Sequence, residues 1–160
     1  MLPASMRLPE LRRLIDQQAY FVIHAPRQVG KTTMMMQLAQ ELTNEGRYAA
    51  IALSAQTAAV FSHDIETAEK LLLSRWRDVA EDDLPPELCP PEWPVGETGQ
   101  RIGAALRAWA RTIPRPLVVF LDEIDATKDE LLLSTLHQIR DGFPQRPKAF
   151  PWSLALIGMR

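Results

Sequence analysis

Short apolar runs alternate with longer amphipathic stretches along most of the chain. Four runs have the length of a strand, and they cover residues 19–25, 48–53, 117–121 and 152–157. They are apolar almost throughout instead of alternating apolar with polar residues, which is typical of strands covered on both faces. The pattern therefore predicts four buried strands.

Between these runs, apolar residues recur at the three- and four-residue spacing of a helix with one buried face. Helices are predicted over roughly residues 7–18, 31–44, 64–79, 98–113 and 127–139. The last helix is expected to begin with a capping box in which Thr127 and Glu130 take part. The side chains predicted to face inward from the second and last helices are Met35, Leu38, Ala39 and Leu42, and Leu132, Leu133, Leu136 and Ile139.

Strands that alternate with helices imply a parallel sheet, because each helix must carry the chain back across the sheet before the next strand begins. We therefore predict a three-layer α/β/α fold with a parallel sheet, of which four strands are detected. The main domain is expected over residues 19–160, with a lead-in helix in residues 1–18.

Residues 81–97 differ in composition from the rest of the chain. They contain five prolines and six acidic residues, which predicts a surface loop and excludes a helix or a central strand. The expected role is a solvated connection, and the alternative is a partner-binding segment built around Trp93.

Composition narrows the classes of function. The chain has 160 residues, 46% of them hydrophobic and 24% charged, with a net charge of −2. These values are ordinary for a globular protein and give no electrostatic reason to expect nucleic-acid or membrane-surface binding. No apolar stretch is long enough for a signal peptide or a membrane span, so a cytoplasmic protein is expected. One cysteine and three histidines without metal-ligand spacing predict neither a disulfide nor a structural metal.

A candidate phosphate-binding loop lies between the first predicted strand and the helix that follows it. Residues 25–33 read APRQVGKTT, which meets the pattern G-x-x-x-x-G-K-[ST] except at its first position, Ala25. Gly30 lets the backbone approach phosphate oxygens, Lys31 brings a cation to the β and γ phosphates, and Thr32 offers a hydroxyl to Mg²⁺. The residues expected to bind the nucleotide are Pro26, Arg27, Gln28, Val29, Gly30, Lys31, Thr32 and Thr33.

Two acidic residues directly follow the apolar run at residues 117–121. Asp122 is the candidate carboxylate for Mg²⁺, together with the Thr32 hydroxyl, and Glu123 is the candidate base that orients and polarises an attacking water. Asp125 is expected to be a turn or capping residue, and His24 a packed residue at a strand end.

These two motifs, APRQVGKTT and FLDEID, resemble those of P-loop ATPases of the AAA-like and STAND type. The likeness runs over nearly the whole chain and includes YFVIHAPRQVGKTT, PRPLVVFLDEIDA, LHQIRDGF and SLALIGMR. The resemblance implies a domain that binds ATP or ADP with Mg²⁺ and hydrolyses ATP. It also implies a homo-oligomer or a downstream effector domain as partner.

In that family the sheet has five parallel strands in the order 5-1-4-3-2, and the resemblance implies that the strand with the acids lies beside the strand of the phosphate loop. Only four strands are found here, so the strand at residues 20–24 would form an exposed edge. The chain accordingly looks like an N-terminal portion that is incomplete at its C-terminus. Arg160 is similar to the sensor arginine of STAND proteins, which reads the γ-phosphate; the alternative is that it belongs to a disordered end.

Two functions stay open from the sequence. The first is an Mg²⁺-dependent ATPase whose hydrolysis drives a conformational switch, and the second is a nucleotide-binding scaffold with little or no hydrolysis. A small-molecule kinase is disfavoured because no acceptor pocket or lid motif is visible. A GTPase and a transporter ATPase are disfavoured because the motifs [NT]-K-x-D and LSGGQ do not occur.

Overall fold

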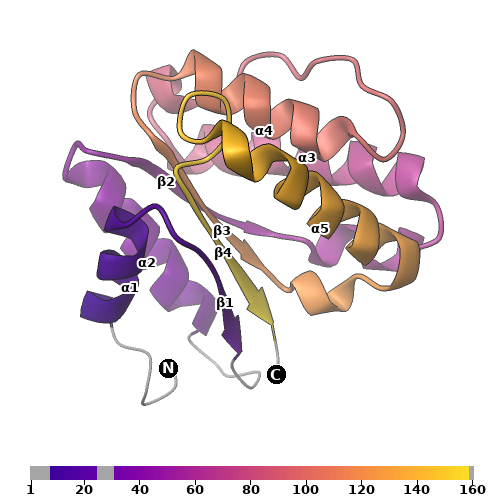
Figure 1. Cartoon of the computed structure of the whole chain (residues 1–160), viewed down its shortest axis with the longest axis horizontal. Helices are drawn as coiled ribbons and strands as arrows, with labels where there is room; N and C mark the ends of the chain where they lie inside the picture. Colours follow the sequence, from indigo (N-terminus) through magenta and orange to yellow (C-terminus); the bar gives the residue numbers. More distant parts are fainter. Residues whose placement is uncertain (1–7, 25–30, 159–160) are drawn as a thin grey trace.

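A four-stranded parallel sheet is covered by helices on both faces (Figure 1). The computed structural model describes residues 8–24 and 31–158. The strands are β1 (Tyr20–His24), β2 (Ala49–Ser54), β3 (Leu117–Asp122) and β4 (Ser153–Gly158), and they lie in the order β1-β4-β3-β2. The predicted α/β fold with a parallel sheet is therefore confirmed.

The helices divide into two layers (Figure 1). One face of the sheet carries α1 (Leu8–Asp16) and α2 (Lys31–Asn44), and the other carries α3 (Ile65–Asp83), α4 (Arg101–Thr112) and α5 (Asp129–Gly142). None of these helices is long and apolar enough to cross a membrane, as judged over the residues that the structure describes.

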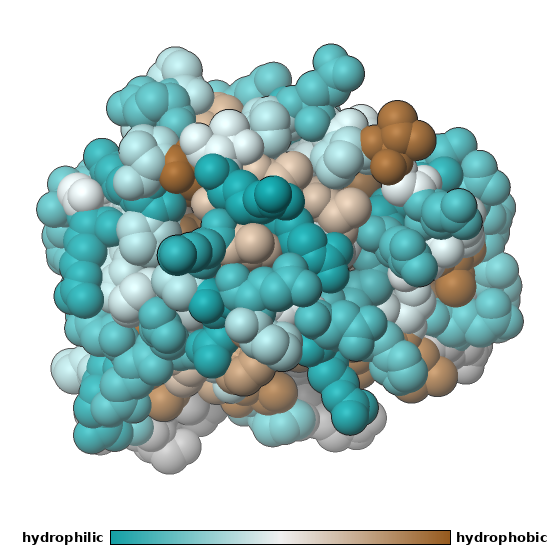
Figure 2. All heavy atoms as spheres, turned by 45° about the horizontal axis from the view of Figure 1, so that its top comes forward, coloured by the Kyte–Doolittle hydropathy of each residue, from teal (hydrophilic) through white to brown (hydrophobic). Residues whose placement is uncertain are grey.

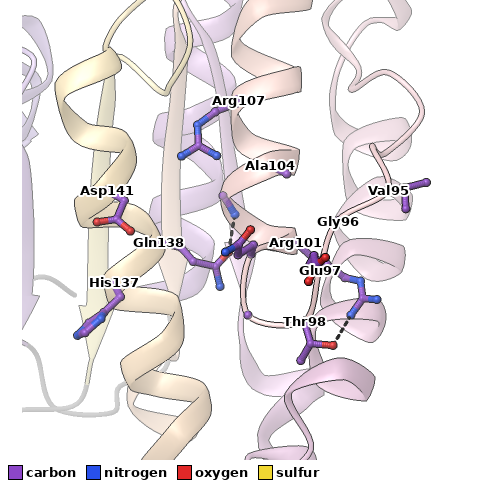
Figure 3. Close-up of a pocket in the computed structure, with 13 residues that line it drawn as sticks. Val95, Gly96, Glu97, Thr98, Arg101, Ala104, Arg107, His137, Gln138 and Asp141 are labelled. Atoms are coloured by element: carbon purple, nitrogen blue, oxygen red, sulfur yellow. Dashed lines mark hydrogen bonds between the residues drawn. The ribbon is translucent and has the colours of Figure 1, made fainter.

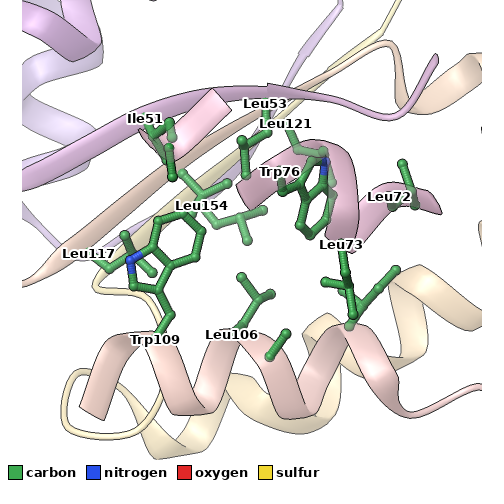
Figure 4. Close-up of a cluster of buried hydrophobic side chains, with 14 of the residues drawn as sticks. Ile51, Leu53, Leu72, Leu73, Trp76, Leu106, Trp109, Leu117, Leu121 and Leu154 are labelled. Atoms are coloured by element: carbon green, nitrogen blue, oxygen red, sulfur yellow. The ribbon is translucent and has the colours of Figure 1, made fainter. Parts of the chain in front are cut away.

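The alternation of side chains along the strands builds two separate cores. Leu53 of β2 and Leu121 of β3 lie in the core under α3, α4 and α5, together with the buried tryptophans Trp76 and Trp109 (Figure 4). Phe120, one residue earlier on β3, points to the opposite face. There it shares a core with the side chains predicted to face inward from α2, which are all buried: Met35, Leu38, Ala39 and Leu42.

Strand β1 lies at an edge of the sheet and is not fully buried. Val22 is 49% exposed, while Ile23 is 2% exposed and contributes to the core under α1 and α2. β4 lies between β1 and β3, so the expectation that the acid-bearing strand adjoins the strand of the phosphate loop is wrong. The observed order β1-β4-β3-β2 nevertheless matches four of the five strands in the order that the resemblance implied.

The start of α5 differs from the prediction. Lys128 occupies the N-cap position without a side-chain hydrogen bond, and the Thr127 hydroxyl donates to the carbonyl of Ile124 (2.6 Å), so no capping box forms. The buried face is also rotated, because Leu131 is 0% exposed whereas Leu133 is 60% exposed. Residues 131–133 are all leucine, so the sequence did not show which of them faces the core.

The segment at residues 81–97 is more ordered and more buried than a solvated loop. α3 continues to Asp83, and a 3₁₀ turn follows at Pro86–Leu88 with Leu88 completely buried. Trp93 packs edge-on against Trp109, with ring centroids 5.9 Å apart, and its Nε1 donates to the Leu73 carbonyl (2.9 Å). The segment therefore packs on the core, and Trp93 belongs to that packing.

A buried carboxylate joins the three helices of the second layer. Glu69 of α3 is 0% exposed and accepts hydrogen bonds from the backbone N–H groups of Gly99 (2.8 Å) and Ile102 (3.2 Å) and from Nε2 of Gln138 (2.9 Å). The N-cap residue Gln100 makes no side-chain capping bond. Glu69 therefore supplies from another helix the acceptor that the first turn of α4 requires.

The end of α5 is held by a contact that leaves no space for a side chain. A Cβ on Gly142 would lie 2.1 Å from Cε1 of Phe150, which is itself completely buried. We expect Gly142→Ala to lower the free energy of unfolding by about 3 kcal/mol, because a ring surrounded by core atoms cannot move aside. Urea unfolding followed by circular dichroism measures the change.

Gly103 of α4 provides the matched control. A Cβ there meets its nearest atoms at 3.5 Å, which is ordinary van der Waals contact. Gly103→Ala is therefore expected to change the free energy of unfolding by less than about 1 kcal/mol, since alanine is the better helix former. Equal stability of the two variants would contradict the role assigned to Phe150.

Candidate functional site

The candidate site lies at the carboxyl edge of the sheet. All four strands are parallel, so their last residues, His24, Ser54, Asp122 and Gly158, come to the same edge (Figure 1). α2 begins at Lys31 beside the end of β1. This edge is where ligands bind in open α/β sheets, next to the first turns of the helices.

The predicted nucleotide-binding residues are only partly described. Lys31 and Thr32 are the first two residues of α2, and Thr33 is exposed in its first turn. The start of α2 at Lys31 agrees with the helix predicted from residue 31. The remaining predicted contacts lie outside the described residues, and they are Pro26, Arg27, Gln28, Val29, Gly30 and Arg160.

Asp122 ends β3 with its carboxyl group turned toward the α2 layer. Its strand neighbour two residues earlier, Phe120, lies in the core under α1 and α2, and alternation places Asp122 on the same side. The residue is 4% exposed, and Oδ1 accepts a hydrogen bond from the backbone N–H of Glu123 (2.8 Å). A buried carboxylate on the side of the sheet that carries α2 could take the predicted role beside Mg²⁺.

Glu123 is held in an unusual backbone conformation. Its φ of 60° and ψ of 33° lie in the left-handed helical region, which costs a residue with a Cβ roughly 1–2 kcal/mol. Its Oε1 accepts a hydrogen bond from the Ser54 hydroxyl (2.9 Å). Strained residues of this kind cluster at functional sites, so the conformation is an independent reason to regard Glu123 as functional.

Ser54 is a site residue that the sequence interpretation missed. It pairs with Asp122 in the register of β2 and β3, and its hydroxyl both donates to Glu123 and accepts from the backbone N–H of Gln56 (3.0 Å). The available signal was a polar residue that ends an otherwise apolar strand, in the sequence IALS. The strand order was needed to connect it with the acids.

Asp125 and His24 are the two residues of this edge that were expected to have structural roles. Asp125 lies in the short 3₁₀ turn Ile124–Ala126, as expected for a turn residue, and its side chain approaches the end of β4. A Cβ on Gly158 would lie 3.6 Å from its Cγ. His24 is exposed at the end of β1, so the expectation of a packed strand end is wrong.

Asp122 and Glu123 do not form a site that could surround a metal with protein ligands alone. They could contribute to a magnesium ion whose other ligands are water and phosphate oxygens. Among residues 8–24 and 31–158 there is no cluster of three histidine, cysteine or acidic residues that could hold a metal. Mg²⁺ commonly takes one or two protein oxygens and completes its shell with water and phosphate oxygens. Asp122 fits this limited role.

A large groove in the described part lies elsewhere. It has a volume of about 970 Å³ and runs between α4 and α5 under residues 95–101 (Figure 3). None of the predicted site residues lines it, and the Arg101, Arg107, Glu97 and Asp141 side chains give it mixed charge. Figure 2 shows a mainly hydrophilic face on which apolar side chains are scattered.

Comparison with known proteins adds evidence on the family. A sequence model described as "ATPase family associated with various cellular activities (AAA)" matches residues 21–150, which is most of the chain. A search of curated proteins finds no match.

Proposed function

The chain belongs to the AAA family of ATPases, and from this membership we propose that it binds ATP with Mg²⁺ and hydrolyses it. The observation that carries the proposal is the pair of acids at the end of β3. Asp122 is buried on the α2 side, and Glu123 is held in a strained conformation against Ser54. Two adjacent carboxylates in different environments suit two different tasks.

In the proposed complex, the nucleotide phosphates lie over the first turn of α2. Backbone N–H groups of residues 27–32 are proposed to donate to the phosphate oxygens, and Lys31 neutralises the β and γ phosphates. Thr32 and Asp122 would hold Mg²⁺, and a bound Mg²⁺ would neutralise the negative charge that develops on the phosphate oxygens. Arg160 is proposed as the residue that contacts the γ-phosphate.

Glu123 is the proposed base. A water oxygen attacks the γ-phosphorus and the bond to the β,γ-bridging oxygen breaks, so ADP leaves with that electron pair. Glu123 accepts a proton from the water, and the products are ADP and inorganic phosphate. The Ser54 hydroxyl, 2.9 Å from Oε1, orients the carboxylate for this task.

The second candidate is a nucleotide-binding scaffold of low turnover. The same hydrogen bond bears on this candidate, because it occupies one of the lone pairs of the Glu123 carboxylate and leaves fewer of them for a water. The finer proposals follow from the resemblance: a STAND-type switch, and a homo-oligomer or an effector domain as partner.

Phosphate release distinguishes the two candidates. The wild-type chain is expected to release phosphate from ATP with Mg²⁺, and chelation by excess EDTA is expected to lower the rate at least tenfold, because the phosphate charge is then no longer neutralised. Restoring Mg²⁺ should restore the rate. Tight ATP binding by calorimetry without phosphate release would favour the scaffold, and absence of both would contradict nucleotide binding itself.

A further inference from the structure

We propose that Trp76 of α3 is a positioning residue for Glu123 and that it acts through Ser54. The inference rests on the proposed function, in which Glu123 is the base. Trp76 is 2% exposed, and its indole lies against the sheet near Leu53 and Leu121 (Figure 4). Its Nε1 donates to the backbone carbonyl of Ser54 (3.1 Å).

The direction of the Ser54 carbonyl follows from the strand ladder. The N–H of Ala55 donates to the carbonyl of Asp122 (3.0 Å), and only every second residue of a parallel strand bonds to a given neighbour. Ala55 therefore faces β3, and the Ser54 carbonyl points to the outer side of β2. Because β2 is an edge strand in the described sheet, a side chain takes the place of a strand partner there.

Ser54 is consequently held on both sides of the strand. Trp76 fixes its carbonyl at the outer edge, and its hydroxyl reaches Oε1 of Glu123 on the inner side. A hydrogen bond of 2.9 Å weakens steeply when the geometry changes, so a small shift at the end of β2 changes how Glu123 is held. The position of the base thus depends on a side chain of α3.

The expected kinetic effect is confined to the chemical step. The proposed nucleotide contacts lie on the loop before α2 and on the first turn of α2. Trp76 is not among the proposed contacts. Trp76→Phe removes the N–H group and keeps most of the buried ring, so we expect kcat to fall about tenfold while KM for ATP changes less than twofold.

Trp109 is a matched control. It lies in the same core at 0% exposure, and its Nε1 also donates to a backbone carbonyl, that of Leu88 (3.0 Å). Trp109→Phe therefore removes the same kind of buried hydrogen bond without a connection to Ser54. Its kcat is expected to stay within twofold of the wild type. In a Ser54→Ala background, Trp76→Phe should have no further effect on kcat.

A second measurement is independent of turnover and uses a variant that keeps both tryptophans. Indole ¹H–¹⁵N resonances are recorded for the whole chain with and without Ser54→Ala. We expect the Trp76 indole signal to shift and the Trp109 signal to stay in place. An unmoved Trp76 signal would overturn the connection, whether or not the chain hydrolyses ATP.

The kinetic outcomes decide whether Trp76 affects catalysis. A lower kcat for Trp76→Phe alone supports the proposal, and equal kcat values for the two phenylalanine variants overturn it. If the wild type binds ATP without turnover, hydrolysis fails as a function, and a Trp76 signal that shifts still supports the structural connection to Ser54.

Discussion

Glu123→Gln is expected to lower phosphate release at least a hundredfold while ATP binding is retained. Glutamine keeps the size of the side chain and can still accept from the Ser54 hydroxyl, which lies 2.9 Å from Oε1. It cannot accept the proton of the attacking water, and general base catalysis commonly contributes a factor of about 10²–10⁴. Single-turnover phosphate release measures the rate, and calorimetry with ATP and Mg²⁺ measures binding.

The neighbouring acid Asp125 is the control for this substitution. It lies two residues further along, in the turn after β3, and has no proposed contact with the water. Asp125→Asn is expected to keep turnover within about threefold of the wild type. Full activity of Glu123→Gln would remove Glu123 from the mechanism, and loss of ATP binding in that variant would instead indicate a binding role.

Lys31→Ala is expected to weaken ATP binding at least a hundredfold, which corresponds to about 3 kcal/mol. Lys31 is the first residue of α2, where the proposed phosphates lie. A lysine at this position of a phosphate loop contacts the β and γ phosphates, and an uncharged methyl group cannot replace it. Alanine favours helix, so α2 is expected to form as before.

Calorimetry with ATP and Mg²⁺ measures this loss, and circular dichroism reports whether the fold persists. Lys128→Ala serves as the control, because Lys128 is an exposed residue at the start of α5 without a proposed phosphate contact. Its affinity should match the wild type. Tight binding by Lys31→Ala would contradict the assignment of residues 25–33 as the phosphate loop.

The layout of the fold could be predicted because its signals are local. Apolar runs and helical spacing predicted the four strands and five α-helices that the described residues form, and the resemblance gave an order in which the sheet confirms four of five strands. Asp122 and Glu123 could be proposed because a buried strand ends directly before them. Each of these inferences uses residues that are close in sequence or a motif of fixed spacing.

The features that the sequence did not predict depend on contacts between distant residues. Ser54 and Glu123 are 69 positions apart and meet only because β2 pairs with β3. Trp93 lies within a proline-rich stretch whose composition suggested solvent exposure, yet its ring packs on Trp109. Neither contact has a local signal, because a polar strand end and a tryptophan in a loop are each compatible with several environments.

Stability and chemistry favour different residues at position 123. The left-handed backbone there, with φ at 60°, suits glycine, which lacks the Cβ that makes this region costly. A redesign guided by folding free energy alone would therefore select glycine and delete the proposed base. Variants that gain thermal stability at this position are expected to be inactive. In a library of variants at position 123, selection for heat tolerance and selection for turnover would therefore retain different residues.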